Sequence, residues 1–105
     1  MTDHERILSG RTAVVTSGAR GLGRAIAKEL AARGVNVALL GLEEDALAQT
    51  ATEVPTASRY WPVDITDEDA MVRAAEDVHR LMGPVSIVVA DARTTDPRGG
   101  PGAKV

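Results

Sequence analysis

The stretch TAVVTSGARGLGRAIAKELAARG, residues 12–34, decides the fold. It opens with the β-branched run TAVVT, which stops at a glycine-containing turn, as a buried strand does. A helix is predicted over residues 21–33, because large apolar side chains recur every four residues and Gly34 follows as a stop. The apolar positions are Leu22, Ile26 and Leu30, with Ala25 and Ala32 small enough for close approach. The stretch therefore predicts strand, glycine turn and helix.

The same alternation continues along the chain. Short apolar or β-branched runs predict further strands over residues 35–40, 59–63 and 85–90. Helices are predicted between them, over residues 43–54 and 67–82. The second of these is expected to be capped by Thr66 and to have an apolar side made of Met71, Val72, Ala75, Val78 and Met82.

The expected fold class is α/β: a Rossmann-like doubly wound parallel sheet, truncated to about four strands and three helices. Right-handed crossovers give the strand order 3-2-1-4. The helices after strands 1 and 2 are then expected on one face, and the helix after strand 3 on the other. Strand 3 lies at an edge in this order, as Pro62 requires, because proline cannot donate to an inner ladder.

Composition narrows the class of function. The 105 residues are 44% hydrophobic and 26% charged, which is typical of a globular domain, and the net charge of −3 argues against a nucleic-acid partner. The sequence contains no cysteine, and its longest apolar run, residues 37–42, is too short to span a membrane. Acidic residues 43–45 and 67–69 complement helix dipoles, so no metal site is expected. We expect a cytoplasmic protein.

The glycine turn GARGLG, residues 18–23, has the chemistry of an anion site. Between a strand and a helix, such a turn directs backbone N–H groups and the positive end of the helix dipole at one point, where a pyrophosphate fits. The turn therefore favours a dinucleotide ligand.

Residues 8–92 resemble the N-terminal, cofactor-binding half of the short-chain dehydrogenase/reductase family. Thr16, Gly21 and Gly23 match the family's usual Thr-Gly-x-x-x-Gly-x-Gly turn, while Ser17 stands where the first glycine is usual. VDITDED, residues 63–69, resembles the family's Asp-Val or Asp-Ile after strand 3, where the acid contacts the adenine. The resemblance implies a dinucleotide site formed by Thr16, Ser17, Gly18, Arg20, Gly21, Leu22, Gly23, Gly41, Leu42, Asp64, Ile65, Asp91 and Ala92.

The cofactor implied is NADP or NAD, with NADP slightly favoured. Gly41 stands where NAD-preferring relatives carry an acid, so nothing at this position repels a 2′-phosphate. Arg20 adds positive charge where NADP-preferring relatives often carry a basic residue. Glu43 lies two residues beyond Gly41 and could reach the same ribose hydroxyls, which keeps NAD open.

The family's chemistry needs a tyrosine followed four residues later by a lysine, and this sequence contains no such pair. Its only tyrosine is Tyr60, and its only lysines are Lys28 and Lys104. Where the family has Asn-Ala-Gly after strand 4, residues 91–93 read Asp-Ala-Arg. We therefore expect the NAD(P)-binding portion of an oxidoreductase that is inactive alone, with no catalytic residue in this chain.

The expected organisation is an N-terminal leader over residues 1–10, a partial dinucleotide-binding domain over 11–92 and a loose tail over 93–105. An alternative function is a noncatalytic interaction module, which pairs through the exposed fourth strand with itself or with a full-length relative. A further alternative is that the tail after Ala90 results from a change of reading frame.

Overall fold

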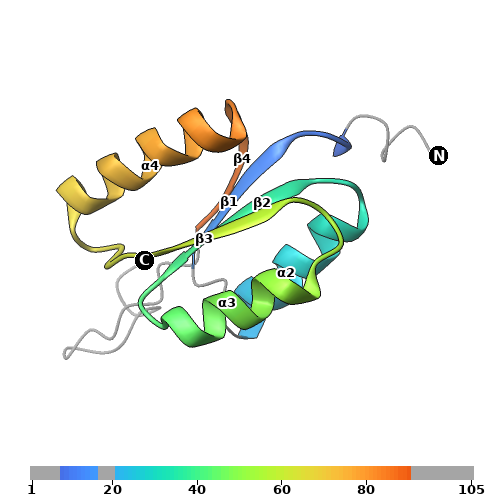
Figure 1. The fold of residues 1–105 in the computed structure, drawn as a ribbon, viewed down its shortest axis with the longest axis horizontal. Coiled ribbons are helices and arrows are strands. Elements are labelled where there is room, and N and C mark those ends of the chain that lie inside the picture. The colour runs from blue at the N-terminus through green and yellow to red at the C-terminus, as the bar shows by residue number, and fades with distance from the viewer. Residues whose placement is uncertain (1–7, 17–20, 91–105) are drawn as a thin grey trace, which may run out of the picture.

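The computed structural model describes residues 8–16 and 21–90 (Figure 1). Its strands are β1 (Thr12–Thr16), β2 (Asn36–Gly41), β3 (Ser58–Pro62) and β4 (Val85–Val89), and its helices are α2 (Gly21–Ala32), α3 (Glu44–Glu53) and α4 (Glu68–Met82). Each predicted element is present, and no end differs by more than one residue from the expected one. The leader over 1–7, the turn over 17–20 and the tail over 91–105 lie outside the described residues.

The four strands form one parallel sheet in the order β3-β2-β1-β4, which confirms the predicted topology. Strand β1 lies inside the sheet between β2 and β4, and its register shifts at Thr12/Ala13 where it pairs with β4. Pro62 ends the edge strand β3, as its missing N–H group predicts.

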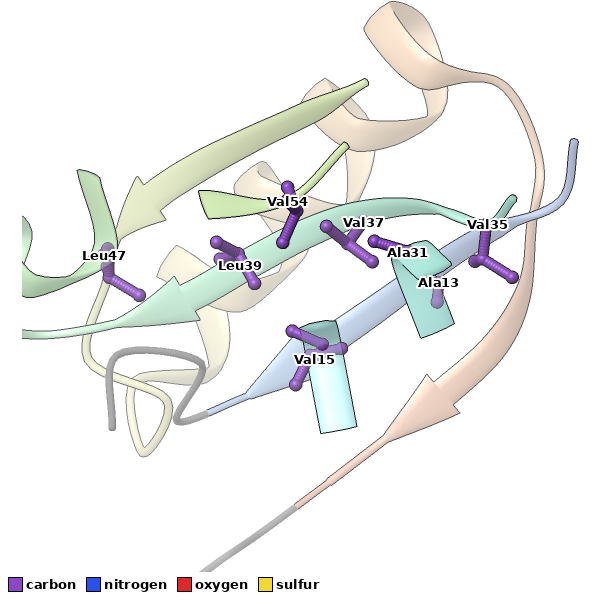
Figure 2. Packing of buried hydrophobic residues seen from close by; sticks show 9 residues of the cluster. Ala13, Val15, Ala31, Val35, Val37, Leu39, Leu47 and Val54 are labelled. Atoms are coloured by element: carbon purple, nitrogen blue, oxygen red, sulfur yellow. The ribbon is translucent and has the colours of Figure 1, made fainter. Parts of the chain in front are cut away.

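The helices cover the two faces as expected: α2 and α3 lie on one side of the sheet and α4 on the other (Figure 1). Alternate residues of β1 and β2 point to the α2 and α3 side (Figure 2), where the buried cluster is Ala13, Val15, Ala27, Ala31, Val35, Val37, Leu39, Leu47 and Val54. The cluster beneath α4 is smaller and consists of Ala38, Leu40, Val63, Ala74 and Val78. Parallel strands need such cover on both faces.

Helix α2 turns a different face to the sheet from the one that its spacing predicts. Its buried residues are Gly23, Ala27 and Ala31, which also recur every four residues. Leu22 is 60% exposed, and Ala25 and Ala32 are exposed as well. The small residues allow the helix backbone to approach the sheet closely, whereas Ile26 and Leu30 lie half-buried on the flank.

The start of α4 also corrects a prediction. Asp67, not Thr66, is the N-cap residue, and its side chain accepts a hydrogen bond from the backbone N–H of Ala70 at 3.1 Å. Thr66 instead donates to the carboxylate of Asp64. Thr66 and Asp67 are both suited to capping a helix, and the second of them, Asp67, caps α4.

The apolar side of α4 is narrower than predicted. Ala74 and Val78 are buried, and Met71 and Met82 pack against the same cluster. Val72 is 53% exposed and Ala75 is exposed, contrary to the prediction. Val72 precedes Val78 by six residues, so at about 100° per residue the two side chains leave the helix in different directions.

Helices α2 and α3 are joined at their surface by an ion-pair network. The guanidinium of Arg24 donates to Glu53 through Nε at 3.1 Å, and the ammonium of Lys28 lies 3.7 Å from the same carboxylate oxygen. The hydrogen bond from Arg24 is the main reason that the pKa of Glu53 is lowered. The network links the two helices at their surface, and Lys28 is part of it.

Candidate active-site region: the carboxyl edge of the sheet

The predicted site residues that the structure describes gather at the carboxyl edge of the sheet. The strand registers pair Thr16 with Leu40 and Gly41 with Pro62, so these strand ends lie side by side. Asp64 follows two residues after Pro62. The structure therefore brings together Thr16, Gly21, Leu22, Gly23, Gly41, Leu42, Asp64 and Ile65 at or next to this edge.

Five predicted site residues cannot be placed. Ser17, Gly18 and Arg20 of the glycine turn lie outside the described residues. Asp91 and Ala92, which follow β4, lie outside them too. Their membership of the site stays a prediction.

Strands β1 and β4 form the switch point of the sheet. The chain leaves β1 toward α2 on one face, whereas it reaches β4 from α4 on the opposite face (Figure 1). Ligands of doubly wound folds bind in the crevice that such a reversal opens at the carboxyl edge. Thr16 is only 5% exposed and links β1 to β4 at this switch point, because its hydroxyl donates to the carbonyl oxygen of Val89 at 3.4 Å.

The start of α2 fits an anionic group. Gly21, its first residue, has a φ of +62°, and a Cβ added there would meet no atom within 4 Å. The first turn of α2 contains no acidic residue that would repel a phosphate. Because the first N–H groups of a helix have no partner within it, the start of α2 directs donors and the positive end of the helix dipole at the position next to Gly21, where a diphosphate would fit.

Strand β2 ends at Gly41, which has no side chain and therefore no charge at this position. Leu42, the next residue, is 72% exposed, and Glu43 precedes α3 without a side-chain cap bond to it. A Cβ at Gly41 would lie 3.6 Å from the side chain of Leu47, an ordinary contact. This position is therefore open to a side chain, although the protein has none there.

Asp64 is a charged residue at the carboxyl edge whose side chain is held in place by hydrogen bonds. Its Oδ1 accepts a hydrogen bond from the Thr66 hydroxyl at 2.6 Å and another from the Thr66 backbone N–H at 2.9 Å. These bonds, the hydroxyl first, lower the pKa of Asp64, whose side chain is exposed. Ile65, next to it, is half-buried. Sequence reasoning assigned Thr66 to capping α4 and missed this role, for which the Asp-x-Thr pattern of a side-chain turn was the available signal.

The residues considered for a proton relay lie elsewhere. Tyr60 packs with the cluster beneath α2 and α3, and Lys28 is engaged with Glu53. Lys104 lies outside the described residues. A shallow hollow lined by Asn36, Ala57, Ser58, Arg59, Leu81 and Met82 lies at the opposite, amino edge and contains none of the predicted site residues.

No group of His, Cys, Asp and Glu within residues 8–16 and 21–90 is arranged to hold a metal ion. None of the helices over these same ranges combines the length and the apolar character that crossing a membrane requires.

The order of the strands, the reversal between β1 and β4 and the glycine at the start of α2 define a dinucleotide-binding fold of the Rossmann class. The chain belongs to the short chain dehydrogenase family, whose model matches residues 11–99.

Relatives in this family are similar to the chain over most of its length. It is 40% identical over 87 residues to the 2-dehydro-3-deoxy-L-rhamnonate dehydrogenase (NAD(+)) of a Sphingomonas species, a match that covers 83% of this chain and 34% of that protein. It is 38% identical over 89 residues to the L-rhamnose 1-dehydrogenase (NADP(+)) of Thermoplasma acidophilum, covering 79% and 34%. The chain thus spans about a third of the length of these curated relatives.

Solved structures give the same family. The L-sorbose reductase of Gluconobacter frateurii, complexed with NADPH and L-sorbose, superposes with a TM-score of 0.74 at 25% identity, covering 84% of this chain and 35% of that one. A metagenomic short-chain oxidoreductase in complex with NADP gives a TM-score of 0.78 at 29% identity, covering 83% and 41%. Both neighbours confirm the Rossmann-like fold.

Proposed function

We propose that this chain is the NAD(P)-binding portion of a short-chain dehydrogenase-type oxidoreductase, which acts on an alcohol or a ketone. The observation that carries the proposal is the meeting of Thr16, Gly21 and Asp64 at the carboxyl edge of a sheet with the switch point between β1 and β4. The complexes of two structural neighbours with NADPH and NADP support it.

In the proposed site, the start of α2 holds the diphosphate and the ends of β2 and β3 hold the adenosine half. The N–H groups of the turn and of the first turn of α2 donate to phosphate oxygens. The residues proposed for the whole site are Thr16, Ser17, Gly18, Arg20, Gly21, Leu22, Gly23, Gly41, Leu42, Asp64, Ile65, Asp91 and Ala92.

We propose NADP in preference to NAD. Gly41 offers no carboxylate where a 2′-phosphate would lie, and Arg20 adds a positive charge to the turn. The names of the relatives include both cofactors, so the preference rests on these two positions.

Within the 105 residues no tyrosine is followed four residues later by a lysine. We therefore propose that these residues bind the cofactor but transfer no hydride by themselves. We also propose a cytoplasmic location, which rests on composition alone.

Calorimetric titration of the purified chain with NADPH and with NADH tests this function. We expect saturable one-site binding of both, with NADPH the tighter. Equal affinities would overturn the preference for NADP. The absence of saturable heat from either coenzyme, with a sample that circular dichroism shows to be folded, would overturn the function itself.

A second candidate function is pairing through β4 with another copy of the chain. The two edges of the sheet differ: β3 carries Arg59 and Pro62, which discourage strand addition, whereas β4, VSIVV, has neither charge nor proline. Val88 of β4 is 67% exposed. An edge of this composition is suited to pairing with a further strand.

A further inference from the structure

The hollow at the amino edge of the sheet lies beside the last turn of α4. Its walls are Leu81 and Met82 at the end of α4, Asn36 at the start of β2, and residues 57–59 at the start of β3. Its volume is about 400 Å³, which is in the range of small-molecule sites. It shares no residue with the proposed cofactor site, which lies at the opposite edge.

The alternation of side chains along the strands directs Asn36 and Arg59 to one side of the sheet. Asn36 precedes Ala38 by two residues, and Arg59 precedes Trp61 by two. Ala38 and Trp61 both belong to the cluster beneath α4. Because side chains two residues apart on a strand point to the same face, Asn36 and Arg59 lie on the α4 side of the sheet as well.

Arg59 brings a positive charge to this hollow that no acidic group balances. Within residues 8–16 and 21–90 its guanidinium takes part in no ion pair and no hydrogen bond, and the carboxamide of Asn36 has no hydrogen-bond partner either. None of the residues that line the hollow is acidic. Asp77, one turn before Leu81 on α4, is bonded to Arg80. A guanidinium presents parallel N–H donors that match a carboxylate, so the hollow is suited to an anionic group of this kind.

The wall formed by α4 is apolar. Leu81 is 43% exposed, and Met82 beside it is half-buried. A ligand that covers Leu81 removes apolar surface from water, which favours binding. The hollow therefore has a cation on the strand side and an apolar surface on the helix side.

We propose that this hollow is a second binding site, which takes an amphipathic monocarboxylate. The carboxylate of the ligand pairs with Arg59 and accepts a hydrogen bond from the Asn36 carboxamide, while its aliphatic chain lies against Leu81 and Met82. A dinucleotide fits this hollow less well, because it carries several charges and the hollow offers one arginine and an apolar wall. The inference does not rest on the proposed function.

Titration of the isotope-labelled full chain with octanoate, followed by two-dimensional amide NMR, tests this site. We expect saturable shifts at Asn36, Ser58, Arg59 and Leu81, with a dissociation constant of about 1 mM. Two further ligands separate the two halves of the interaction. Acetate has the carboxylate without the chain, and octylammonium has the chain with the opposite charge. Neither is expected to give saturable shifts at the hollow over the same range of concentration.

The substitution Arg59→Gln removes the charge and retains a polar side chain. Arg59 is exposed and has no partner within the described residues, so we expect the variant to fold like wild type. Octanoate binding should weaken about threefold to fivefold, the effect of one exposed ion pair. Arg73→Gln is the matched control, because Arg73 is also exposed and without an ion pair in the described ranges, but lies on α4 outside the hollow. It should leave the dissociation constant unchanged.

The proposal is overturned if the octanoate shifts rise linearly without saturating, or if they lie at Gly21 and Gly41 and not at the hollow. Binding of octylammonium at the hollow as tight as that of octanoate would also overturn it. Equal effects of Arg59→Gln and Arg73→Gln would show that only the overall charge matters, and this would overturn it too. None of these outcomes concerns NADPH at the carboxyl edge, so failure of this inference is distinguishable from failure of the proposed function.

Discussion

Gly21 is the residue on which the proposed diphosphate site depends most. Its φ of +62° lies in the left-handed region, where an L side chain costs roughly 1–2 kcal/mol. Its surroundings are open, so the constraint comes from the backbone and not from packing. A residue other than glycine would have to change the backbone angle, and this would redirect the N–H groups of the first turn of α2.

The substitution Gly21→Ala tests this dependence, and Gly83→Ala is its matched control. Gly83 has a φ of +88° and equally open surroundings, but it is the C-cap residue of α4 and lies away from the carboxyl edge of the sheet. Both variants should lose stability in thermal unfolding, Gly83→Ala the more, because Gly83 combines its φ of +88° with a ψ of −175°, a region that essentially only glycine adopts. Only Gly21→Ala is expected to weaken NADPH binding, by about tenfold or more, equivalent to ~1.4 kcal/mol. Equal dissociation constants for the two variants would show that Gly21 does not shape the site.

At this scale the motif predicted Asp64 as a site residue, and the structure places this residue after β3 at the carboxyl edge of the sheet. Its contact with a cofactor stays a prediction. Thr66 and Asp67 are both suited to capping α4, and the choice between them depends on where the Asp64 carboxylate lies. The Asp-x-Thr pattern was the signal in the sequence that Thr66 would bond to Asp64 instead.

Among the elements, α2 shows what periodicity does and does not determine. The spacing of apolar residues predicted its length to within one residue. Two stripes with the same spacing run along it, one of large residues and one of Gly23, Ala27 and Ala31, and the second faces the sheet. The choice between them depends on the distance between helix and sheet, which is a property of the packed fold and not of a single helix.

Strand β4 is the element that distinguishes the two candidate functions. If β4 pairs with a second copy, a lysine on this strand should oppose that pairing, because charged side chains on an edge strand discourage the addition of another strand. We expect light scattering of the eluting chain to show a dimer that Val88→Lys converts to a monomer. Val72→Lys is the control, since Val72 is also an exposed valine but lies on α4. A wild-type chain that stays monomeric at high concentration, or a dimer insensitive to Val88→Lys, contradicts pairing through β4.

For the whole molecule, the alternation of elements predicted the topology. Three helices alternate with four strands, which predicts a parallel sheet with right-handed crossovers, and the sheet has the Rossmann order 3-2-1-4 among the common doubly wound orders. The proposed location of the cofactor site rests on the same arrangement, because strand ends distant in sequence meet at one edge. This chain spans about a third of the length of the curated relatives that it matches.

The two ends of the sheet offer different surfaces to a ligand. The carboxyl edge has the start of α2, Gly41 and Asp64, whereas the amino edge has the hollow next to Arg59. A dinucleotide has phosphates that the arginine could attract nonspecifically. Binding alone is therefore weaker support for the proposed function than binding at the carboxyl edge.

The most direct test maps bound NADPH on the molecule by two-dimensional amide NMR of the isotope-labelled chain. We expect saturable shifts at Thr16, Gly21, Gly41 and Asp64, and unchanged signals at Asn36 and Ser58 on the amino edge. Shifts confined to the amino edge, or a folded spectrum that NADPH leaves unchanged, would contradict a dinucleotide site at the start of α2.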